Sequence, residues 1–366
     1  MLKRLADWLK ERIQGRPFEA FQIEVTSRCN LRCEMCPKRA LGDEWVSQDL
    51  PWDAFQRIAT TFGQSRHIHL QGWGEPLLHS RLFDMIRLAK ERGCRVGLTT
   101  NGTLLDRAKS VGLLDAGLDL MAVSIAGATR ETHERIRVGS DLSTILENVQ
   151  GILSLRASRK RKTPKLELSY LMTKTNMAEL LKTVELAAAL GVDELYAINL
   201  DYVVTPEHEE LKVFDCPGFR QTYSGILDAA RETARRNGLT FRAYPLESEE
   251  VAVCEENPLR ILFVSADGWV SPCTYMGLAG RTDIPRRFQG RSASVRRLRF
   301  GNVLDQGLLD IWNSPAYRTF RQEFETRRLE LGARALLVVS GGEQFSDMEM
   351  PPAPAPCRTC YKLYGL

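Results

Sequence analysis

The chain has 366 residues, of which 43% are hydrophobic and 26% are charged, a composition typical of globular proteins and unlike that of disordered or collagen-like chains. Its formal net charge of +4 is too small to favour nucleic acid as a partner. No run of residues approaches the roughly 20 apolar positions that a membrane-spanning helix needs.

Residues 1–17 are predicted to form an N-terminal amphipathic helix, because Leu2, Leu5, Leu9 and Ile13 recur at helical spacing among charged residues. The segment lacks the apolar stretch and the small-residue cleavage site of a secretory signal peptide. We expect this helix to pack on the domain that follows. Binding to a membrane surface is the less favoured interpretation.

From residue 18 to about 205, strand-like runs alternate with helical runs. Strands are predicted at 21–25, 67–71, 95–99, 121–125, 165–172 and 194–201, with helices such as 82–92, 142–155 and 177–190 between them. Six strand–helix units favour a parallel sheet that curls as a partial (β/α)6 barrel of the TIM type. We assign residues 18–237 to this α/β domain, with 206–210 as an acidic turn and 217–237 as one further helix.

Beyond residue 237 the pattern changes. Short strands are predicted at 261–264 and 269–270, an arginine-rich segment spans 281–299, and a helix begins at 308 and ends near 330. The stretch 341–356 has the composition of a turn and a polyproline segment. We therefore expect a second, smaller domain at 238–366.

The chain contains nine cysteines, an odd number without an export signal, so thiolate metal ligands are a better interpretation than a disulfide framework. This usage favours a cytoplasmic protein. Three cysteines lie early, four lie late and two are isolated, which predicts two metal sites. They are Cys29, Cys33 and Cys36; Cys254, Cys273, Cys357 and Cys360; and Cys94 and Cys216.

The early cysteines form a C-x3-C-x2-C motif directly after the first predicted strand. Ligands gather at the carboxyl ends of the strands of such barrels. Three thiolates can hold three irons of a cubane cluster, which leaves the fourth iron without a protein ligand and open to chemistry. Structural zinc needs four ligands, and no fourth Cys or His lies nearby.

This motif resembles the hallmark of the radical S-adenosylmethionine (SAM) superfamily. The segment Gly72-Trp73-Gly74-Glu75-Pro76 is similar to the superfamily's GGEP element, in which backbone and carboxylate hold the amino group of SAM. Two further segments that follow predicted strands, 99–102 and 124–127, resemble positions near the ribose and the carboxylate of SAM. The resemblance implies SAM binding by Met35, Gly72, Gly74, Glu75, Thr100, Asn101, Ser124 and Arg137.

Two of these assignments have an alternative. Arg137 resembles the arginine that binds the SAM carboxylate, but a solvated helix arginine is also possible. Met35 stands where the superfamily often has an aromatic residue, and its thioether can still pack on adenine.

The resemblance implies a definite chemistry. SAM would chelate the open iron, and an electron from the reduced cluster would cleave the sulfonium to give a 5′-deoxyadenosyl radical that abstracts hydrogen from a substrate. A flavodoxin or a ferredoxin is the expected electron donor. The remaining task of the protein is to bind, orient and exclude water.

The late cysteines follow the pattern C-x13-G-x4-C, then C-x2-C. Four thiolates satisfy either zinc or a 4Fe–4S cubane, and spacing alone does not separate the two. Together with the segments 300–302 and 311–313, the pattern resembles the auxiliary-cluster extension called SPASM, in its shortened form called twitch. The resemblance implies one auxiliary 4Fe–4S cluster, with Cys254, Cys273, Cys357 and Cys360 on its four irons, because only six residues follow Cys360.

Three residues are candidates for catalysis: Cys216, Asp201 and Tyr170. Asp201 ends the sixth predicted strand, where substrate contacts are expected. Cys216 follows that strand and could donate a hydrogen atom, approach the auxiliary cluster or be a loop thiol. Alternation within 165–172 does not settle which face points inward, so Tyr170 stays open. Cys94 is expected to be a packed core thiol.

The basic runs 156–165 and 281–299 lack interleaved aromatic residues. They are interpreted as solvated faces, as docking sites for an acidic flavodoxin or ferredoxin, or as anion contacts.

Three hypotheses of function follow. The first is oxidative modification, by dehydrogenation or cross-linking, of a small molecule or peptide. The second is a redox-neutral epimerase, decarboxylase or lyase reaction with Cys216 as the hydrogen donor. The third is a non-catalytic iron–sulfur electron carrier or metal scaffold. Seventeen residues before the barrel are too few for a leader-peptide-binding domain, although a separate protein could supply one.

Overall fold

The computed structural model describes residues 15–339, without the side chains of 334–339, and residues 350–366. Most of the helix predicted at 1–17 and most of the loop predicted at 341–356 therefore lie outside the described residues. None of the helices in the described part of the chain is both long enough and apolar enough to cross a bilayer.

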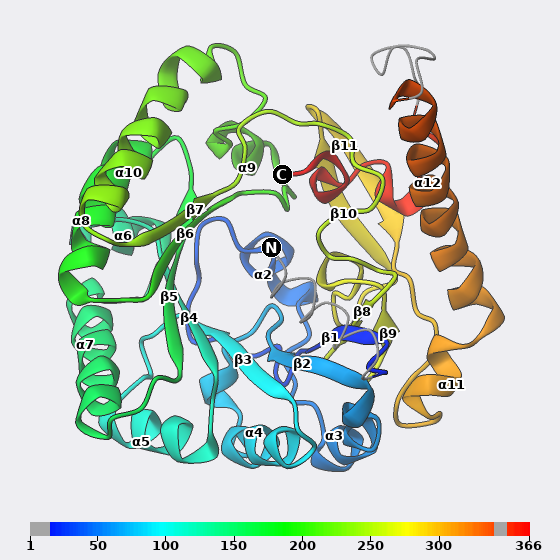
Figure 1. Ribbon diagram of the computed structural model, residues 1–366, viewed down its shortest axis with the longest axis horizontal. Helices are drawn as coiled ribbons and strands as arrows, with labels where there is room; N and C mark the ends of the chain where they lie inside the picture. Colours follow the sequence, from blue (N-terminus) through cyan, green and yellow to red (C-terminus); the bar gives the residue numbers. More distant parts are fainter. Residues whose placement is uncertain (1–14, 340–349) are drawn as a thin grey trace.

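One nine-stranded sheet organises the molecule, in the order β7-β6-β5-β4-β3-β2-β1-β8-β9. Each strand from β1 to β7 runs parallel to its neighbours. Their bounds are β1 Phe18–Ile23, β2 Ser65–Leu70, β3 Arg95–Thr100, β4 Leu120–Ile125, β5 Lys165–Met172, β6 Glu194–Asn199 and β7 Thr240–Ala243. The sheet curls around a central space but does not close (Figure 1), so the expected partial barrel is confirmed.

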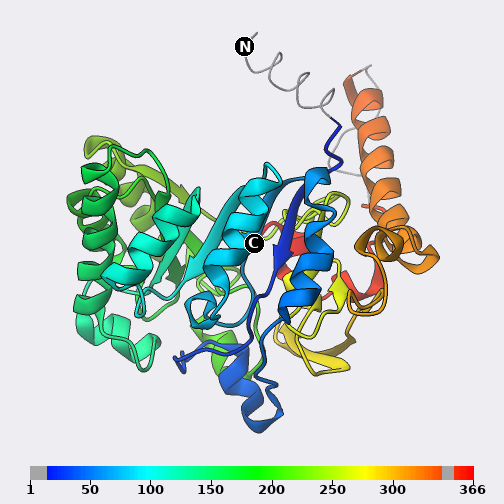
Figure 2. The ribbon, with the colours of Figure 1, turned by 90° about the horizontal axis from the view of Figure 1, so that it is seen from below.

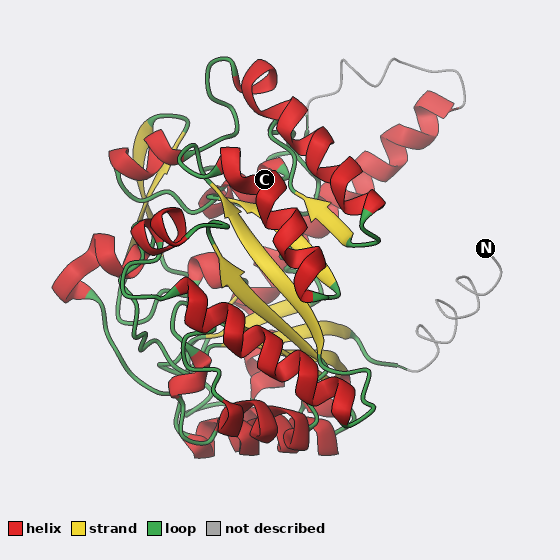
Figure 3. Cartoon of the chain, turned by 90° about the vertical axis from the view of Figure 1, so that its left-hand side faces the viewer, coloured by secondary structure: helices red, strands yellow, loops and turns green. Residues whose placement is uncertain are grey.

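Helices cover the outer face of this sheet (Figures 1 and 3). They are α3 Trp52–Ala59, α4 Leu82–Glu91, α5 Arg107–Ala116, α6 Arg130–Ile136, α7 Leu142–Ser158, α8 Leu180–Leu190 and α10 Gly225–Arg236. Gly191 ends α8 in the left-handed conformation, with φ of 75°, as the sequence predicts. Apolar side chains fill the layer between sheet and helices; for example, the Phe55 ring from α3 lies 5.5 Å from that of Phe62.

The structure corrects three expectations for the residues after 205. Residues 206–210 are not a turn but the helix α9, Pro206–Leu211, because the Thr205 side chain caps its first turn by accepting from the amide of His208. The helix predicted at 217–237 begins as a π-helix, Arg220–Ser224, and continues as α10. The third difference is a strand not assigned from the sequence, β7, which pairs with β6.

The C-terminal part joins the same sheet at its other edge. Strand β8, Ile261–Val264, runs parallel to β1, with Phe21 opposite Leu262, and β9, Val270–Ser271, pairs with β8 in the antiparallel sense. The domain boundary after residue 237 stays a prediction, with β7 and β8 extending the sheet beyond it. Figure 2 shows these late elements, yellow to red, at the end of the molecule opposite the teal and green helices.

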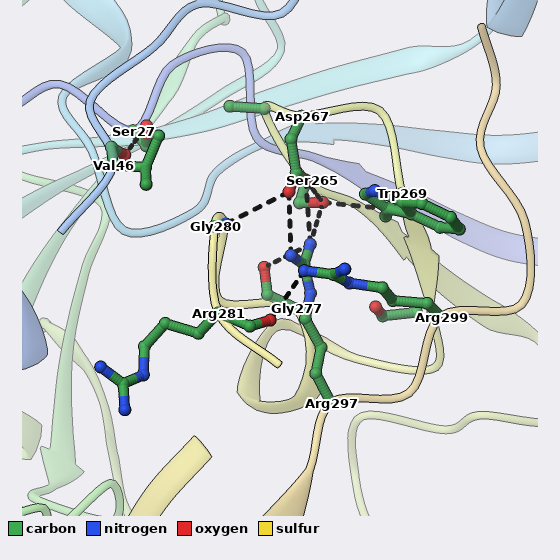
Figure 4. A network of polar contacts seen from close by, with 12 residues as sticks. Ser27, Val46, Ser265, Asp267, Trp269, Gly277, Gly280, Arg281, Arg297 and Arg299 are labelled. Atoms are coloured by element: carbon green, nitrogen blue, oxygen red, sulfur yellow. Dashed lines mark hydrogen bonds and ion pairs between the residues drawn. The ribbon is translucent and has the colours of Figure 1, made fainter. Parts of the chain in front are cut away.

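The arginine-rich segment is a β-hairpin of β10, Asp283–Phe288, and β11, Arg291–Arg296. Two helices follow it, α11 Leu308–Trp312 and α12 Pro315–Val339. Just after the hairpin, the fully buried side chain of Arg297 lies 2.8 Å from Asp267 and donates to Ser265 at 2.7 Å (Figure 4). Asp267 also accepts from the amide of Gly280 at 3.2 Å. This network fixes the loop after Cys273 against the turn between β8 and β9.

Candidate functional site

A cavity of about 480 Å³ opens on the inner side of the sheet. Side chains from β2 to β7 form its wall, and the loop that follows β1 forms one end. Every candidate for SAM binding lines it: Met35, Gly72, Gly74, Glu75, Thr100, Asn101, Ser124 and Arg137. The cysteines Cys29, Cys33 and Cys36 line it as well.

The early cysteine loop is held by its own backbone and by the end of α6. The amides of Arg32 and Glu34 donate to the carbonyls of Val138 and Ile136 at 3.0 and 2.8 Å. Burial raises the pKa of the Cys36 thiol to about 12 and also raises that of Cys29. Three thiols on one short loop at the cavity are a donor set that suits three irons of a cubane cluster.

Close contact with the segment that follows β1 explains both glycines of the Gly72–Glu75 segment. A Cβ atom on Gly74 would lie 2.2 Å from the carbonyl oxygen of Thr26, and one on Gly72 would lie 2.4 Å from Cγ of Glu24. Glycine lets this loop lie directly on the segment that leads into the cysteine loop. The amide of Glu75 then donates to the Arg28 carbonyl at 2.8 Å, which places the Glu75 carboxylate at the cavity.

The Glu75 carboxylate is held by three donors. It accepts from the Thr100 hydroxyl and the Asn101 amide, each at 2.7 Å, and from the Leu77 amide at 3.1 Å. Burial raises its pKa. A carboxylate has about four acceptor positions, so one remains for an ammonium group of a ligand. Thr100 therefore holds the Glu75 carboxylate in place. The sequence did not identify this role, because the resemblance implied a position near the ribose of SAM.

Arg137 presents an unpaired donor at this end of the cavity. Arg137 lines the cavity. Its Nε atom is buried and has no hydrogen-bond partner among the described residues. Buried donors are nearly always paired in folded proteins, so an anionic ligand group suits this position. The surroundings fit the carboxylate of SAM better than they fit a solvated helix arginine.

Neighbouring side chains organise this end of the cavity. Nδ1 of His133, on α6, accepts a hydrogen bond from the amide of Ala126 at 3.2 Å. This bond holds the turn that follows β4, the strand that carries Ser124. Burial lowers the pKa of His133 to about 3, so its ring is neutral. Asn30 accepts from the Asn101 side chain at 2.9 Å. Neither His133 nor Asn30 was selected from the sequence.

The four late cysteines lie near one another, and Cys254, Cys273 and Cys360 each lie within two positions of a residue that lines the cavity: Glu255, Tyr275 and Lys362. Thiolates at Cys254, Cys357 and Cys360 all raise the pKa of Cys273, after the larger effect of its own burial. Burial raises the pKa of Cys254 to about 12. Among the described residues, no group of three or more His, Cys, Asp or Glu is arranged around a single metal ion. Four converging thiols are the donor set of a 4Fe–4S cluster.

Of the three catalytic candidates, the structure brings only Asp201 to the cavity. Its carboxylate lies 2.7 Å from Nζ of Lys362 and accepts from the Tyr275 hydroxyl, with both oxygens at 3.1 Å. Tyr275 and Lys362 line the cavity too, and each lies two positions after a late cysteine. That proximity in sequence was the signal that could have identified them.

Tyr170 and Cys216 lie elsewhere. The Tyr170 side chain is completely buried in the hydrophobic core, where its hydroxyl donates to the Asn176 carbonyl at 2.6 Å. Ser169 and Leu171, its neighbours on β5, line the cavity instead, so Tyr170 faces the helices. Cys216 follows α9 and is not among the residues that line the cavity. Cys94 is buried in the core, as expected.

The rest of the cavity wall carries paired charges. Arg242 of β7 contacts Glu167 at 3.2 Å and also pairs with Glu194, and its guanidinium lies 4.0 Å from the Tyr196 ring centre. Burial raises the pKa of Glu167 to about 7, with the neighbouring Glu194 as a further cause. This wall lies beyond the SAM candidates and offers polar contacts for a second molecule.

Comparison with known proteins agrees with this geometry. Residues 23–187 match the family model of the radical SAM superfamily, and residues 254–333 match that of SPASM, an iron–sulfur cluster-binding domain. The chain is 32% identical over 303 residues, 82% of each chain, to a tungsten-containing aldehyde ferredoxin oxidoreductase cofactor-modifying protein from Pyrococcus furiosus. It is 31% identical over 206 residues, 54% of this chain and 64% of the other, to a probable GTP 3′,8-cyclase from Saccharolobus islandicus.

Solved structures share the fold at low sequence identity. Streptococcus suis SuiB bound to SAM aligns with a TM-score of 0.62 and 14% identity, covering 88% of this chain and 72% of SuiB. The protein anSMEcpe with bound SAM aligns with a TM-score of 0.59 and 18% identity, covering 83% and 79% of the two chains. The chain therefore belongs to the radical SAM superfamily, carries a C-terminal SPASM domain, and uses SAM together with 4Fe–4S clusters, one of which is auxiliary.

Proposed function

We propose that this enzyme oxidatively modifies a small molecule or a peptide, by dehydrogenation or cross-linking. The observation that carries the proposal is the shared cavity. Glu75 and Arg137 line this cavity, and so do Tyr275 and Lys362, each two positions after a late cysteine. A substrate in this cavity would contact the SAM site and the surroundings of the auxiliary cluster at once, the arrangement that an oxidation needs.

We assign the metal ligands by donor chemistry. Cys29, Cys33 and Cys36 would hold three irons of the SAM-binding cluster, and the four late cysteines would hold all irons of the auxiliary cluster. Glu75 would bind the amino group of SAM and Arg137 its carboxylate. When bound, the reduced cluster and SAM supply the radical chemistry that removes hydrogen from the substrate.

We assign proton uptake to Asp201. The oxidation removes a hydrogen atom from a substrate C–H bond and then an electron from the substrate radical that results. The neighbouring N–H, O–H or C–H bond releases one proton in the second step. The Asp201 carboxylate lines the cavity, and Lys362 and Tyr275 fix its position. A carboxylate held in this way orients its acceptor atoms before the proton is released.

The names of relatives agree with this range of substrates. The Pyrococcus furiosus relative is named for modifying a cofactor, and SuiB has been solved with a precursor peptide. We propose that a flavodoxin or a ferredoxin supplies the electron, and that the enzyme acts in the cytoplasm, where thiols stay reduced.

The redox-neutral alternative depends on a hydrogen donor at the cavity. Cys216, the donor considered, does not line the cavity, so nothing in its placement supports that reaction. The non-catalytic alternative loses its basis, because the superfamily to which the chain belongs is one of enzymes.

Two measurements on the reduced, anaerobic protein test the proposal. Incubation with SAM should give 5′-deoxyadenosine, and an intact cofactor would reject radical catalysis. Once a substrate is in hand, reductant should be needed only in catalytic amounts, since oxidation returns the electron. One equivalent of reductant consumed per product would reject the oxidative outcome while leaving radical catalysis in place.

A further inference from the structure

Arg286 is a buried cation without an acidic partner. Three arginines of the described residues are more than nine-tenths buried: Arg286, Arg297 and Arg327. Arg297 lies 2.8 Å from Asp267 (Figure 4), and Arg327 lies 2.9 Å from Glu250. For Arg286, on β10, no carboxylate lies within ion-pair distance in the described part of the chain. An unpaired buried charge is strongly unfavourable, so an anionic group is missing from its surroundings.

The atoms that do contact Arg286 flank the late cysteines. Its Nη1 donates to the carbonyl of Pro356 at 3.1 Å, next to Cys357. Its Nη2 lies 3.3 Å from the sulfur of Met276, whose amide donates to the carbonyl of Cys273 at 3.2 Å. These two contacts place the guanidinium between the two segments that supply three of the four late cysteines.

A third donor of the same group has no partner. The Nε atom of Arg286 is buried without a hydrogen bond in the described residues. The cation and the free N–H of Arg286 therefore lie beside the segments that carry the late cysteines.

We propose that Arg286 is a positioning residue of the auxiliary cluster: its Nε–H donates to a sulfur of the cluster or of a ligand cysteine, and its charge raises the reduction potential of the cluster. The inference rests on the proposed ligation of that cluster by the four late cysteines. It also gives a function to one arginine of the 281–299 segment, whose role the sequence left open.

The physical reason is electrostatic. A cubane with four thiolates carries net negative charge, and reduction by one electron adds another. A nearby cation and an N–H bond to sulfur stabilise the more negative form, which raises the potential. A higher potential makes the cluster a better acceptor for an electron from the substrate, with no bond formed or broken at Arg286.

Other charges near the cysteines set the background for this effect. Glu256 raises the pKa of Cys254 and Cys273, and Glu323 that of Cys357. Lys362 lowers the pKa of Cys254 and Cys360. Arg286 differs from Lys362 because Lys362 already pairs with Asp201 and Glu255, whereas the charge of Arg286 has no carboxylate partner.

The test is a redox titration followed by electron paramagnetic resonance. The full chain with Cys29, Cys33 and Cys36 replaced by Ala keeps only the auxiliary cluster. In this background, Arg286→Gln should make reduction about tenfold less favourable, which is about 59 mV for one electron. The matched control is Arg291→Gln, an exposed arginine of the same hairpin, which should leave the potential unchanged.

Each outcome decides the proposal. An unchanged potential in Arg286→Gln, or an equal decrease in Arg291→Gln, overturns it. If Arg286→Gln loses its iron, the titration is done on Arg286→Lys, which keeps the charge but lacks the Nε–H: a decreased potential supports the proposal and an unchanged one overturns it. Iron that persists after Cys357→Ala in the same background would instead reject the ligand assignment. No substrate turnover is needed, so failure of the oxidative proposal is separately visible.

Discussion

The ammonium of Lys362 lies 2.7 Å from the carboxylate of Asp201, and this pair joins the end of β6 to the C-terminal segment that carries the last two cysteines. The Lys362 side chain is 5% exposed and that of Asp201 is 12% exposed. Lys362 also donates to the Tyr244 hydroxyl at 2.8 Å and pairs with Glu255 at 2.7 Å. The contact therefore holds the C-terminal segment against the end of β6, at the wall of the cavity.

Replacing Lys362 by Met should destabilise the protein by roughly 3 kcal/mol, because the change leaves a buried carboxylate unpaired. The free energy of unfolding can be followed by tryptophan fluorescence in denaturant under anaerobic conditions. The double variant Lys362→Met with Asp201→Asn should recover part of the loss. Glu255→Gln is the control, and its effect should stay below about 1 kcal/mol because about half of the Glu255 side chain is exposed. Equal losses in the single and the double variants would contradict the pairing.

Replacing Cys29, Cys33 and Cys36 by Ala should lower the iron content by about one 4Fe–4S equivalent from about two. The measurement is iron per chain after anaerobic purification. Cys94→Ala serves as the matched control, since that thiol is buried in the core and donates to the Phe62 carbonyl. Iron that stays near two equivalents in the triple variant would reject these three residues as ligands.

Gly74→Ala should weaken SAM binding at least tenfold, which corresponds to about 1.4 kcal/mol. The added methyl group would meet backbone oxygens of Thr26 and Arg28 at 2.2 and 2.6 Å, and backbone yields less readily than a side-chain end. The loop that carries Glu75 would have to move. Equilibrium dialysis against SAM measures the effect.

The control for this change is Gly151→Ala, in the middle of α7. A Cβ atom there has nothing within 4 Å, and alanine is the better helix former by about 1 kcal/mol. Gly151→Ala should bind SAM like the unmodified protein and be slightly more stable. Wild-type affinity in Gly74→Ala would show that the close contact does not position the SAM loop.

The SAM end of the cavity could be predicted from sequence because its residues are local. Each motif follows a strand with a clear apolar run, and the carboxyl ends of neighbouring parallel strands meet at one edge of the sheet. Cys29, Glu75, Asn101 and Ser124 all reach the same cavity for this reason. Gly72 and Gly74 added a further indication, because glycine allows the loop to approach its neighbours closely, as it approaches Glu24 and Thr26 here.

Other parts of the fold could not be predicted in the same way, because the contacts that define them join residues distant in sequence or because the apolar pattern is ambiguous. Nothing in the run 261–264 indicates that it pairs with β1, more than two hundred residues earlier. Strand β7 is a short, half-exposed edge strand with a weak apolar pattern. Tyr170 illustrates a different failure, since most of β5 is buried on both faces and alternation does not show which face lines the cavity.

Glu24 should make stability depend on pH between about 4.5 and 7. Its carboxylate is buried and accepts from the amides of Trp73 and Ala266 at 2.8 and 3.0 Å, which links the SAM loop to the C-terminal part. Burial raises its pKa from 4.5 to about 7. The folded state therefore holds the proton more tightly than the unfolded state. Protonated Glu24 therefore adds on the order of 3 kcal/mol to the free energy of unfolding below pH 4.5, relative to its value above pH 7. This stabilisation is lost as the pH rises from 4.5 to about 7.

Comparison with Glu24→Gln isolates this effect from that of other carboxyl groups whose pKa is raised, such as Glu167, because both proteins contain them. The variant should be less stable than the unmodified protein at pH 5, because an amide offers one acceptor where two amides donate. That difference should shrink as the pH approaches 7, since only the unmodified protein then has to bury a charge. Denaturant midpoints at several pH values measure it. A difference that stays constant from pH 5 to 7 would mean that Glu24 ionises at its ordinary pKa in the folded protein.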